Sequence, residues 1–199
     1  DCQFLKTLDR QNLLSGYAEM LKHGLISEEG HWAELMTFDM DHPDYGKLQQ
    51  LVGESVQIKE RIVAQDPFEQ GIRKALNLGH TIGHAFESFA LEREAPVLHG
   101  YAVAWGMVCE LYLAHQKTGF PTDKMRQTVQ FIKENYGKLA FNCRDYDRLY
   151  EFMKHDKKNA AAGMINFTLL GGIGDIRINQ TATKEEINEA LDFYCETMG

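Results

Sequence analysis

The sequence predicts a mainly α-helical protein with one small β-hairpin, organised as a single domain over residues 1–199. Two observations support this fold class. Apolar residues recur at helical spacing through most of the chain, and the segments that carry them end at Gly or Pro. The alternation of apolar and polar residues that is typical of strands occurs only near the C-terminus. The chain has no internal repeat, low-complexity tract or clear linker.

The expected helices are delimited by residues that stop or start a helix. Gly24 lies near the end of the first helix, Pro67 closes the second, and a loop with Pro96 separates the third from the fourth. In the fourth helix Ala102 and Gly106 are one turn apart, which allows another helix to pack closely. The expected helices cover residues 13–25, 45–65, 69–90, 100–117, 121–137 and 146–155.

The C-terminal part is expected to form a hairpin followed by a last helix. Apolar residues alternate up to Leu169 and again from Ile176, and the glycine-rich run 171–174 between them breaks the chain. Thr183 and Glu186 have the spacing of a capping box, which predicts a helix start.

Composition excludes several classes of protein. With 44% hydrophobic residues the chain can fill a core, and its net charge of −8 without a basic stripe argues against nucleic-acid binding. The longest mostly apolar run, 101–114, is too short to span a bilayer. The four cysteines are far apart, which favours reduced thiols in a cytoplasmic protein. The chain begins without Met, close to a helical pattern, and we expect it to be a piece of a longer protein.

The most informative segment is 73–87. In a continuous helix, Arg73, Asn77, His80, His84 and Glu87 fall within about 80° of one another. A solvated face favours Lys and Glu and a core face favours Leu, Ile and Val, so this stripe predicts the wall of a polar site. The two histidines at i and i+4 are spaced either to share one metal ion or to place a ligand beside a general base.

Further polar residues lie at positions flanked by glycine. Glu19, Lys22 and His23 share one helix face, and His99 begins the helix that follows the Pro96 loop. Lys59 interrupts an expected inward-facing stripe formed by Leu48, Val52, Val56 and Val63. Each feature alone has an ordinary explanation: a surface ion pair, a capping or exposed His, a Lys that reaches solvent. Together they predict one Glu and two His ligands around a divalent metal, with cations for an anionic substrate.

Three segments resemble the 3-dehydroquinate synthase family of the shikimate pathway. They are SGYAEMLKHG at 15–24, the segment from Lys59 through DPFEQGIRKALNLGHTIGHAFE at 66–87, and LHGYAVAWGM at 98–107. The run 155–158 before the hairpin also fits, and the resemblance extends from about residue 13 to about 178. It implies the C-terminal helical domain of the dehydroquinate-synthase-like fold. In that family an NAD-binding α/β domain precedes this region.

The resemblance also implies roles for individual residues. Glu19, His80 and His99 would bind Zn²⁺ (or Co²⁺), and His84 would be the catalytic base. The substrate, 3-deoxy-D-arabino-heptulosonate 7-phosphate, would contact a set of polar side chains: Lys22, Lys59, Glu69, Arg73, Asn77, and Lys157 or Lys158. The implied reaction is NAD-dependent, releases phosphate and forms 3-dehydroquinate. The full-length enzyme is expected to be a homodimer, and this chain alone is expected to be inactive.

Four other functions compete with this interpretation. A sugar-phosphate cyclase that makes an inosose or a valiolone would share most of the site. A metal-dependent polyol dehydrogenase would usually begin its ligand set with Asp, whereas this chain has Glu19. A phosphohydrolase of the His-Asp type is suggested only by His155 and Asp156, which lie among lysines. A non-catalytic metal-binding module is the fourth alternative.

Overall fold

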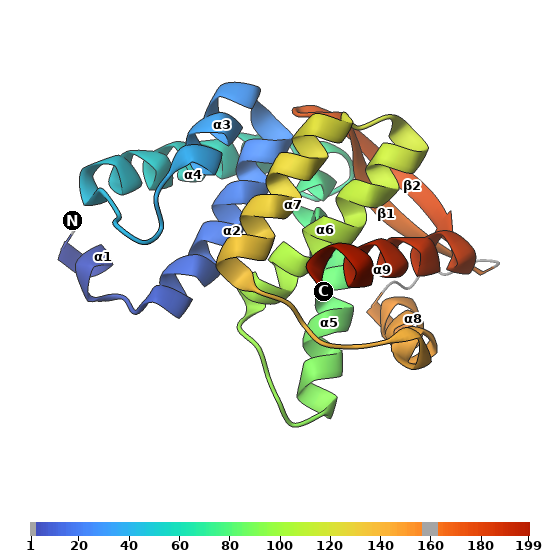
Figure 1. The fold of residues 1–199 in the computed structure, drawn as a ribbon. Helices are drawn as coiled ribbons and strands as arrows, with labels where there is room; N and C mark the ends of the chain where they lie inside the picture. Colours follow the sequence, from blue (N-terminus) through green and yellow to red (C-terminus); the bar gives the residue numbers. More distant parts are fainter. Residues whose placement is uncertain (1–2, 157–162) are drawn as a thin grey trace.

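The computed structural model describes residues 3–156 and 163–199. Helices make up most of this part, and one two-stranded antiparallel sheet lies near the C-terminus, which confirms the predicted fold class (Figure 1). The elements in chain order are α1 (Gln3–Thr7), α2 (Arg10–Ser27), α3 (Glu29–Thr37), α4 (Tyr45–Gln65), the 3₁₀ helix η1 (Ile72–Asn77), α5 (His80–Glu92), α6 (His99–Thr118), α7 (Thr122–Tyr136), the 3₁₀ helix η2 (Cys143–Asp145), α8 (Tyr146–Asp156), β1 (Met164–Gly172), β2 (Asp175–Thr183) and α9 (Lys184–Met198).

Helix α6 lies at the centre of the core. Every residue from 102 to 111 is buried, because small and apolar side chains cover all faces of this stretch except at Glu110. Helices α2, α5, α7 and α9 and strand β1 pack against it. Gly106 allows α5 to approach closely, since a methyl group there would lie 2.1 Å from the carbonyl oxygen of Gly79. The close packing expected from Ala102 and Gly106 is therefore present.

The predicted hairpin and the helix after it are both found. Ile165 pairs with Ala182, and the register shifts just beyond Phe167. Strand β1 contacts α6, and Figure 1 shows the hairpin on the side of the molecule away from α1. The capping box is formed as predicted: Thr183 Oγ1 accepts from the Glu186 amide, and the Glu186 side chain accepts from the Thr183 amide.

The expected continuous helix over 69–90 is wrong. Residues 72–77 form η1, the chain then turns at Gly79, and α5 begins at His80. Gly79 has a φ of +79°, a left-handed conformation that glycine adopts readily, and its carbonyl lies directly against α6 at Gly106. Because of this turn, α5 packs on α6 without continuing the direction of η1. Of the predicted stripe, His80, His84 and Glu87 therefore lie on α5, whereas Arg73 and Asn77 lie on η1.

The predicted inward face of α4 is confirmed at Leu48 and wrong at Val56. The buried side of this helix consists of Leu48, Leu51, Ser55, Ile58 and Ile62. Val56 is 48% exposed, and Lys59 is exposed beside Ile58 rather than lying within the buried stripe. The buried residues are spaced alternately three and four apart, as on one face of a helix, and Val52 of the expected stripe packs beside them partly buried.

Helix α3 was not expected from the sequence. It buries Trp32 and Leu35 against α2, and a side chain at Gly24 would meet Leu35 at 2.8 Å. Gly24 therefore permits this close approach and does not end α2, which continues to Ser27. In the part of the chain that the structure describes, no helix has the length and apolar character needed to cross a membrane.

Candidate metal centre

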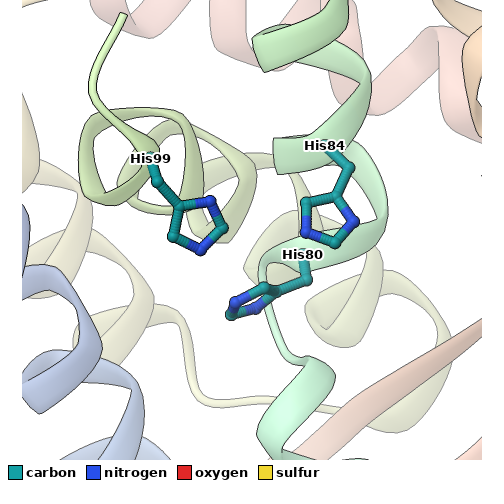
Figure 2. A group of neighbouring side chains, drawn as sticks. All are labelled: His80, His84 and His99. Atoms are coloured by element: carbon teal, nitrogen blue, oxygen red, sulfur yellow. The ribbon is translucent and has the colours of Figure 1, made fainter.

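Three imidazoles from two helices face a common space (Figure 2). His80 and His84 lie one turn apart at the start of α5, and His99 is the first residue of α6. The ring centroid of His80 is 5.3 Å from that of His84 and 5.3 Å from that of His99. One ring nitrogen from each residue lies within 4.8 Å of the others, which is close enough for the three to hold one metal ion.

A carboxylate from α2 completes this group. Glu19 Oε1 lies 3.4 Å from His80 Nε2 and 3.5 Å from His99 Nε2. This oxygen is buried and has no hydrogen bond of regular geometry within the described part of the chain. A buried carboxylate oxygen is normally paired, because leaving it unpaired is expensive. Its position between two ring nitrogens therefore fits a cation between Glu19, His80 and His99.

Contacts on the far side of each ring orient the nitrogens. His80 Nδ1 lies 3.0 Å from the Leu78 carbonyl oxygen, which can only accept, so Nδ1 carries a proton and Nε2 is the nitrogen that can offer a lone pair to a metal ion. His99 Nδ1 likewise lies 3.1 Å from Glu87 Oε2. Both Nε2 atoms thus face Glu19 Oε1. Two imidazoles and one carboxylate form a donor set suited to catalytic zinc.

The charge on Glu19 is favoured by its neighbours. Burial acts to raise the pKa of this carboxyl, but the interaction with His80 and the charge of Lys22 outweigh it and hold the pKa well below its usual range. Lys22 Nζ lies 2.5 Å from Glu19 Oε2. Burial in turn lowers the pKa of Lys22, which Glu19 only partly offsets and which Lys59 reinforces. The charge of Lys59 is one cause of the lowered pKa of Lys22, so the two cations lie near each other.

His23 lies in the wall behind this group. It is buried, and its Nδ1 contacts Ser55 Oγ of α4. Burial and the charge of Lys22 lower the pKa of His23 to about 4, so the ring is neutral at physiological pH. His23 thereby joins α2 to α4 without adding charge beside Lys22.

Three of the predicted substrate contacts form a second group, in the segment between α4 and α5. Asn77 Nδ2 donates to Glu69 Oε1 at 3.0 Å, and Arg73 donates to the Pro67 carbonyl oxygen at 2.8 Å. The Asp66 carboxylate accepts from three backbone amides, including that of Arg73, and so folds the segment into a compact turn. Lys157 and Lys158 lie outside the described residues.

The placement of His99 near Glu19 depends on Gly100. The Gly100 amide donates to Ser15 Oγ at 3.0 Å, and a methyl group at Gly100 would lie 1.9 Å from the Ser15 carbonyl oxygen. Only glycine allows two backbones to meet this closely. Because Ser15 is one turn before Glu19 on α2, this contact brings the start of α6 to the carboxylate.

Two residues have structural roles at this site that the sequence did not reveal. Glu87 was placed on the polar stripe, but its contact with His99 depends on how α5 and α6 pack. The signal for Glu87 in the sequence was its position two helical turns after His80. Glu110 was assigned no role, although a carboxylate within an otherwise apolar helix is itself a signal.

Comparison with known proteins identifies the family. The family model described as 3-dehydroquinate synthase C-terminal matches residues 16–159. The 3-dehydroquinate synthase of Parabacteroides distasonis is 62% identical over 199 residues, which are 100% of this chain and 56% of the relative. That of Bacillus pumilus is 35% identical over 96% of this chain and 52% of its own length. The chain thus spans about half the length of the curated relatives it matches.

Solved structures share the fold. A 2-epi-5-epi-valiolone synthase from Streptomyces hygroscopicus, solved with NAD⁺ and Zn²⁺ bound, superposes with a TM-score of 0.81 at 24% identity, over 98% of this chain and 54% of that one. A 2-deoxy-scyllo-inosose synthase, complexed with carbaglucose-6-phosphate, NAD⁺ and Co²⁺, gives a TM-score of 0.80 at 20% identity, over 96% and 55%. At these identities the likeness concerns the fold alone. From the match over residues 16–159 and the relative at 62% identity, the chain belongs to the 3-dehydroquinate synthase C-terminal domain family.

Proposed function

We propose that this chain is the metal- and substrate-binding half of a 3-dehydroquinate synthase. One observation carries the proposal: Glu19 Oε1 is buried without a regular hydrogen bond and faces the Nε2 atoms of His80 and His99. A divalent ion, Zn²⁺ or Co²⁺, held by these three residues would act as a Lewis acid on a substrate hydroxyl. The metals in the two structural relatives support this choice.

The cations of the site are proposed to hold the anionic substrate, 3-deoxy-D-arabino-heptulosonate 7-phosphate. Lys22 is buried, Lys59 is exposed, and the two lie near enough for their charges to interact, so the pair can meet a carboxylate or a phosphate that enters from solvent. Arg73 and Asn77 would contact further oxygens of the substrate, with Glu69 orienting Asn77. Lys157 and Lys158 are proposed to approach the phosphate. Binding of an anionic substrate depends more on where these cations lie than on the net charge of −8.

His84 is proposed to transfer the proton. Its ring lies 5.3 Å from that of His80 and 5.8 Å from that of His99, so it borders the space that the metal and the reacting carbons would share. NAD⁺, bound mainly by the part of the full-length protein outside this chain, would accept and return a hydride. With the hydroxyl oxidised, the neighbouring C–H would be acidic enough for His84 to take its proton or pass it on, and phosphate could then leave. The net reaction is loss of phosphate with closure of a carbocycle.

His84 could also be a metal ligand, since its ring nitrogen fits the same cluster of three. We assign His84 to proton transfer because Glu19, His80 and His99 already make up three ligands.

We further propose that the full-length protein is a cytoplasmic homodimer. The free thiols of Cys109, Cys143 and Cys195 fit a reducing compartment.

The decisive experiment assays the full-length protein with NAD⁺ and Zn²⁺. Phosphate release and the carbocyclic product are measured with 3-deoxy-D-arabino-heptulosonate 7-phosphate and, in parallel, with glucose 6-phosphate. We expect turnover of the first substrate, with 3-dehydroquinate identified by mass spectrometry. Preferred turnover of glucose 6-phosphate would instead assign the protein to the inosose-type cyclases, and turnover of neither would refute a cyclase of either kind.

A further inference from the structure

Glu110 places a carboxylate in the middle of the core. The residue is fully buried on α6, between apolar neighbours. Its Oε1 accepts from the backbone amide of Gly79 at 3.0 Å, and its Oε2 accepts from that of Ile82 at 3.1 Å. Both oxygens of one side chain therefore hold the first turn of a neighbouring helix, α5.

The start of α5 needs such a partner. The first amides of a helix have no acceptor within the helix, and a side chain at the position before the helix usually supplies one. Here that position is Gly79, which has no side chain to offer. Glu110 provides the acceptor from another helix, at the end of α5 where the helix dipole also favours a negative group. Gly79 remains free to take its left-handed turn against Gly106.

The two bonded amides lie on either side of His80. Its backbone is therefore held both before and after it, while its ring is held through Nδ1 by the Leu78 carbonyl. Glu110 lies on the same helix as His99, about three turns after His99 at the start of α6. Helix α6 thus supplies one imidazole directly and fixes the position of another through Glu110.

We propose that Glu110 is a positioning residue for the metal centre: its carboxylate holds the first turn of α5 so that His80 faces Glu19 and His99. The inference rests on the proposed function, because it concerns the same metal centre. An apolar residue at this position would fill the core without the desolvation that a carboxylate suffers. The presence of a carboxylate at this position is explained if the placement of His80 depends on it.

The test uses the full-length protein, freed of metal by a chelator and titrated with Co²⁺. Co²⁺ is chosen because its visible absorption reports the geometry of its ligands. Glu110→Gln keeps the size of the side chain but leaves only one acceptor for the two amides. The matched control is Thr128→Val, which removes another fully buried hydrogen bond, from Trp32 Nε1 to Thr128 Oγ1 at 3.0 Å, between α3 and α7. Hydrogen exchange of the segment 79–86 is measured in each variant without metal.

We expect Glu110→Gln to raise the Kd for Co²⁺ by about 10–100-fold, to change the Co²⁺ spectrum and to speed exchange in segment 79–86. Thr128→Val should lower the melting temperature while leaving the Kd, the spectrum and that exchange as in the wild type. Equal Co²⁺ binding by Glu110→Gln and the wild type, or an equal loss in Thr128→Val, overturns the proposal. If the wild type bound no Co²⁺, the proposed metal centre would fail, and the exchange data alone would decide whether Glu110 holds α5.

Discussion

His99 Nδ1 lies 3.1 Å from Glu87 Oε2, so the first residue of α6 is oriented by a carboxylate two turns along α5 from His80. We expect Glu87→Ala to weaken Zn²⁺ binding by about 10–100-fold, because the His99 ring loses the acceptor that fixes its tautomer. Glu87→Gln retains an acceptor for Nδ1 and should lose much less Zn²⁺ affinity. Competition with a chromophoric chelator measures the Zn²⁺ affinity of both variants. Equal affinities of the two variants would show that the contact does not orient the ligand.

The two histidines of α5 are expected to behave differently when replaced. In the full-length enzyme, His84→Ala should retain its zinc and lose about 10²-fold or more in kcat, since a positioned acid–base group contributes about 10²–10⁴-fold. His80→Ala should lose both zinc and activity, because it removes a proposed ligand. Elemental analysis and steady-state kinetics of the two variants test this. Release of metal by His84→Ala with retention by His80→Ala would exchange the two roles.

The buried imidazole of His23 should make stability depend on pH. Burial and the charge of Lys22 lower its pKa in the folded state from 6.5 to about 4. Between these values the unfolded chain binds more protons than the folded one, so the free energy of unfolding falls as the pH drops through this window. The full effect is about 3 kcal/mol. Above pH 6.5 this contribution is complete.

Urea unfolding of metal-free protein at several pH values measures this dependence. His23→Asn, which can still bond Ser55 but does not titrate here, should flatten the curve between pH 6.5 and 4. Glu19, Lys59 and His31 also influence His23, so the same variant separates its contribution from theirs. The control is His42→Asn, at a ring that is 88% exposed. If both variants flattened the curve equally, the buried ring would not be its source.

This chain alone is expected to release no phosphate from the heptulosonate substrate, even with NAD⁺ and Zn²⁺ present. The reason is that the proposed NAD⁺ site lies mainly in the part of the full-length relatives beyond the residues matched here. A phosphate assay on the isolated chain, with the full-length protein as positive control, tests this. Clear turnover by the isolated chain would mean that NAD⁺ binds within residues 1–199.

The fold was predictable where the signals are local. The bounds of α4 agree with the structure because Asp44 caps its first turn and Pro67 follows its end. The break at Gly79 could not be predicted in the same way, because its left-handed turn is stabilised by Gly106 and Glu110 on another helix. A glycine within a helical pattern does not by itself reveal such a partner.

The site was predictable by residue type but not by arrangement. The family resemblance implied that Glu19, His80 and His99 belong to one site, and the structure brings these side chains together. The sequence could not show that Oε1 of Glu19 faces both rings, because that depends on how three helices cross. The prediction that Lys59 lies within the inward-facing stripe was wrong for a similar reason. Several apolar residues of α4 fit more than one stripe, and only packing decides which of them is buried.

The contact between Gly100 and Ser15 has a consequence for the order of folding. These residues are 85 positions apart, so their meeting closes a long loop and is entropically unfavourable until much of the core has assembled. Helices α5 and α6 are near neighbours in the chain and can associate earlier, which would bring the histidines together before Glu19 joins them. During refolding, a Co²⁺ spectrum should therefore pass from a weak histidine-only form to its final form as α2 docks.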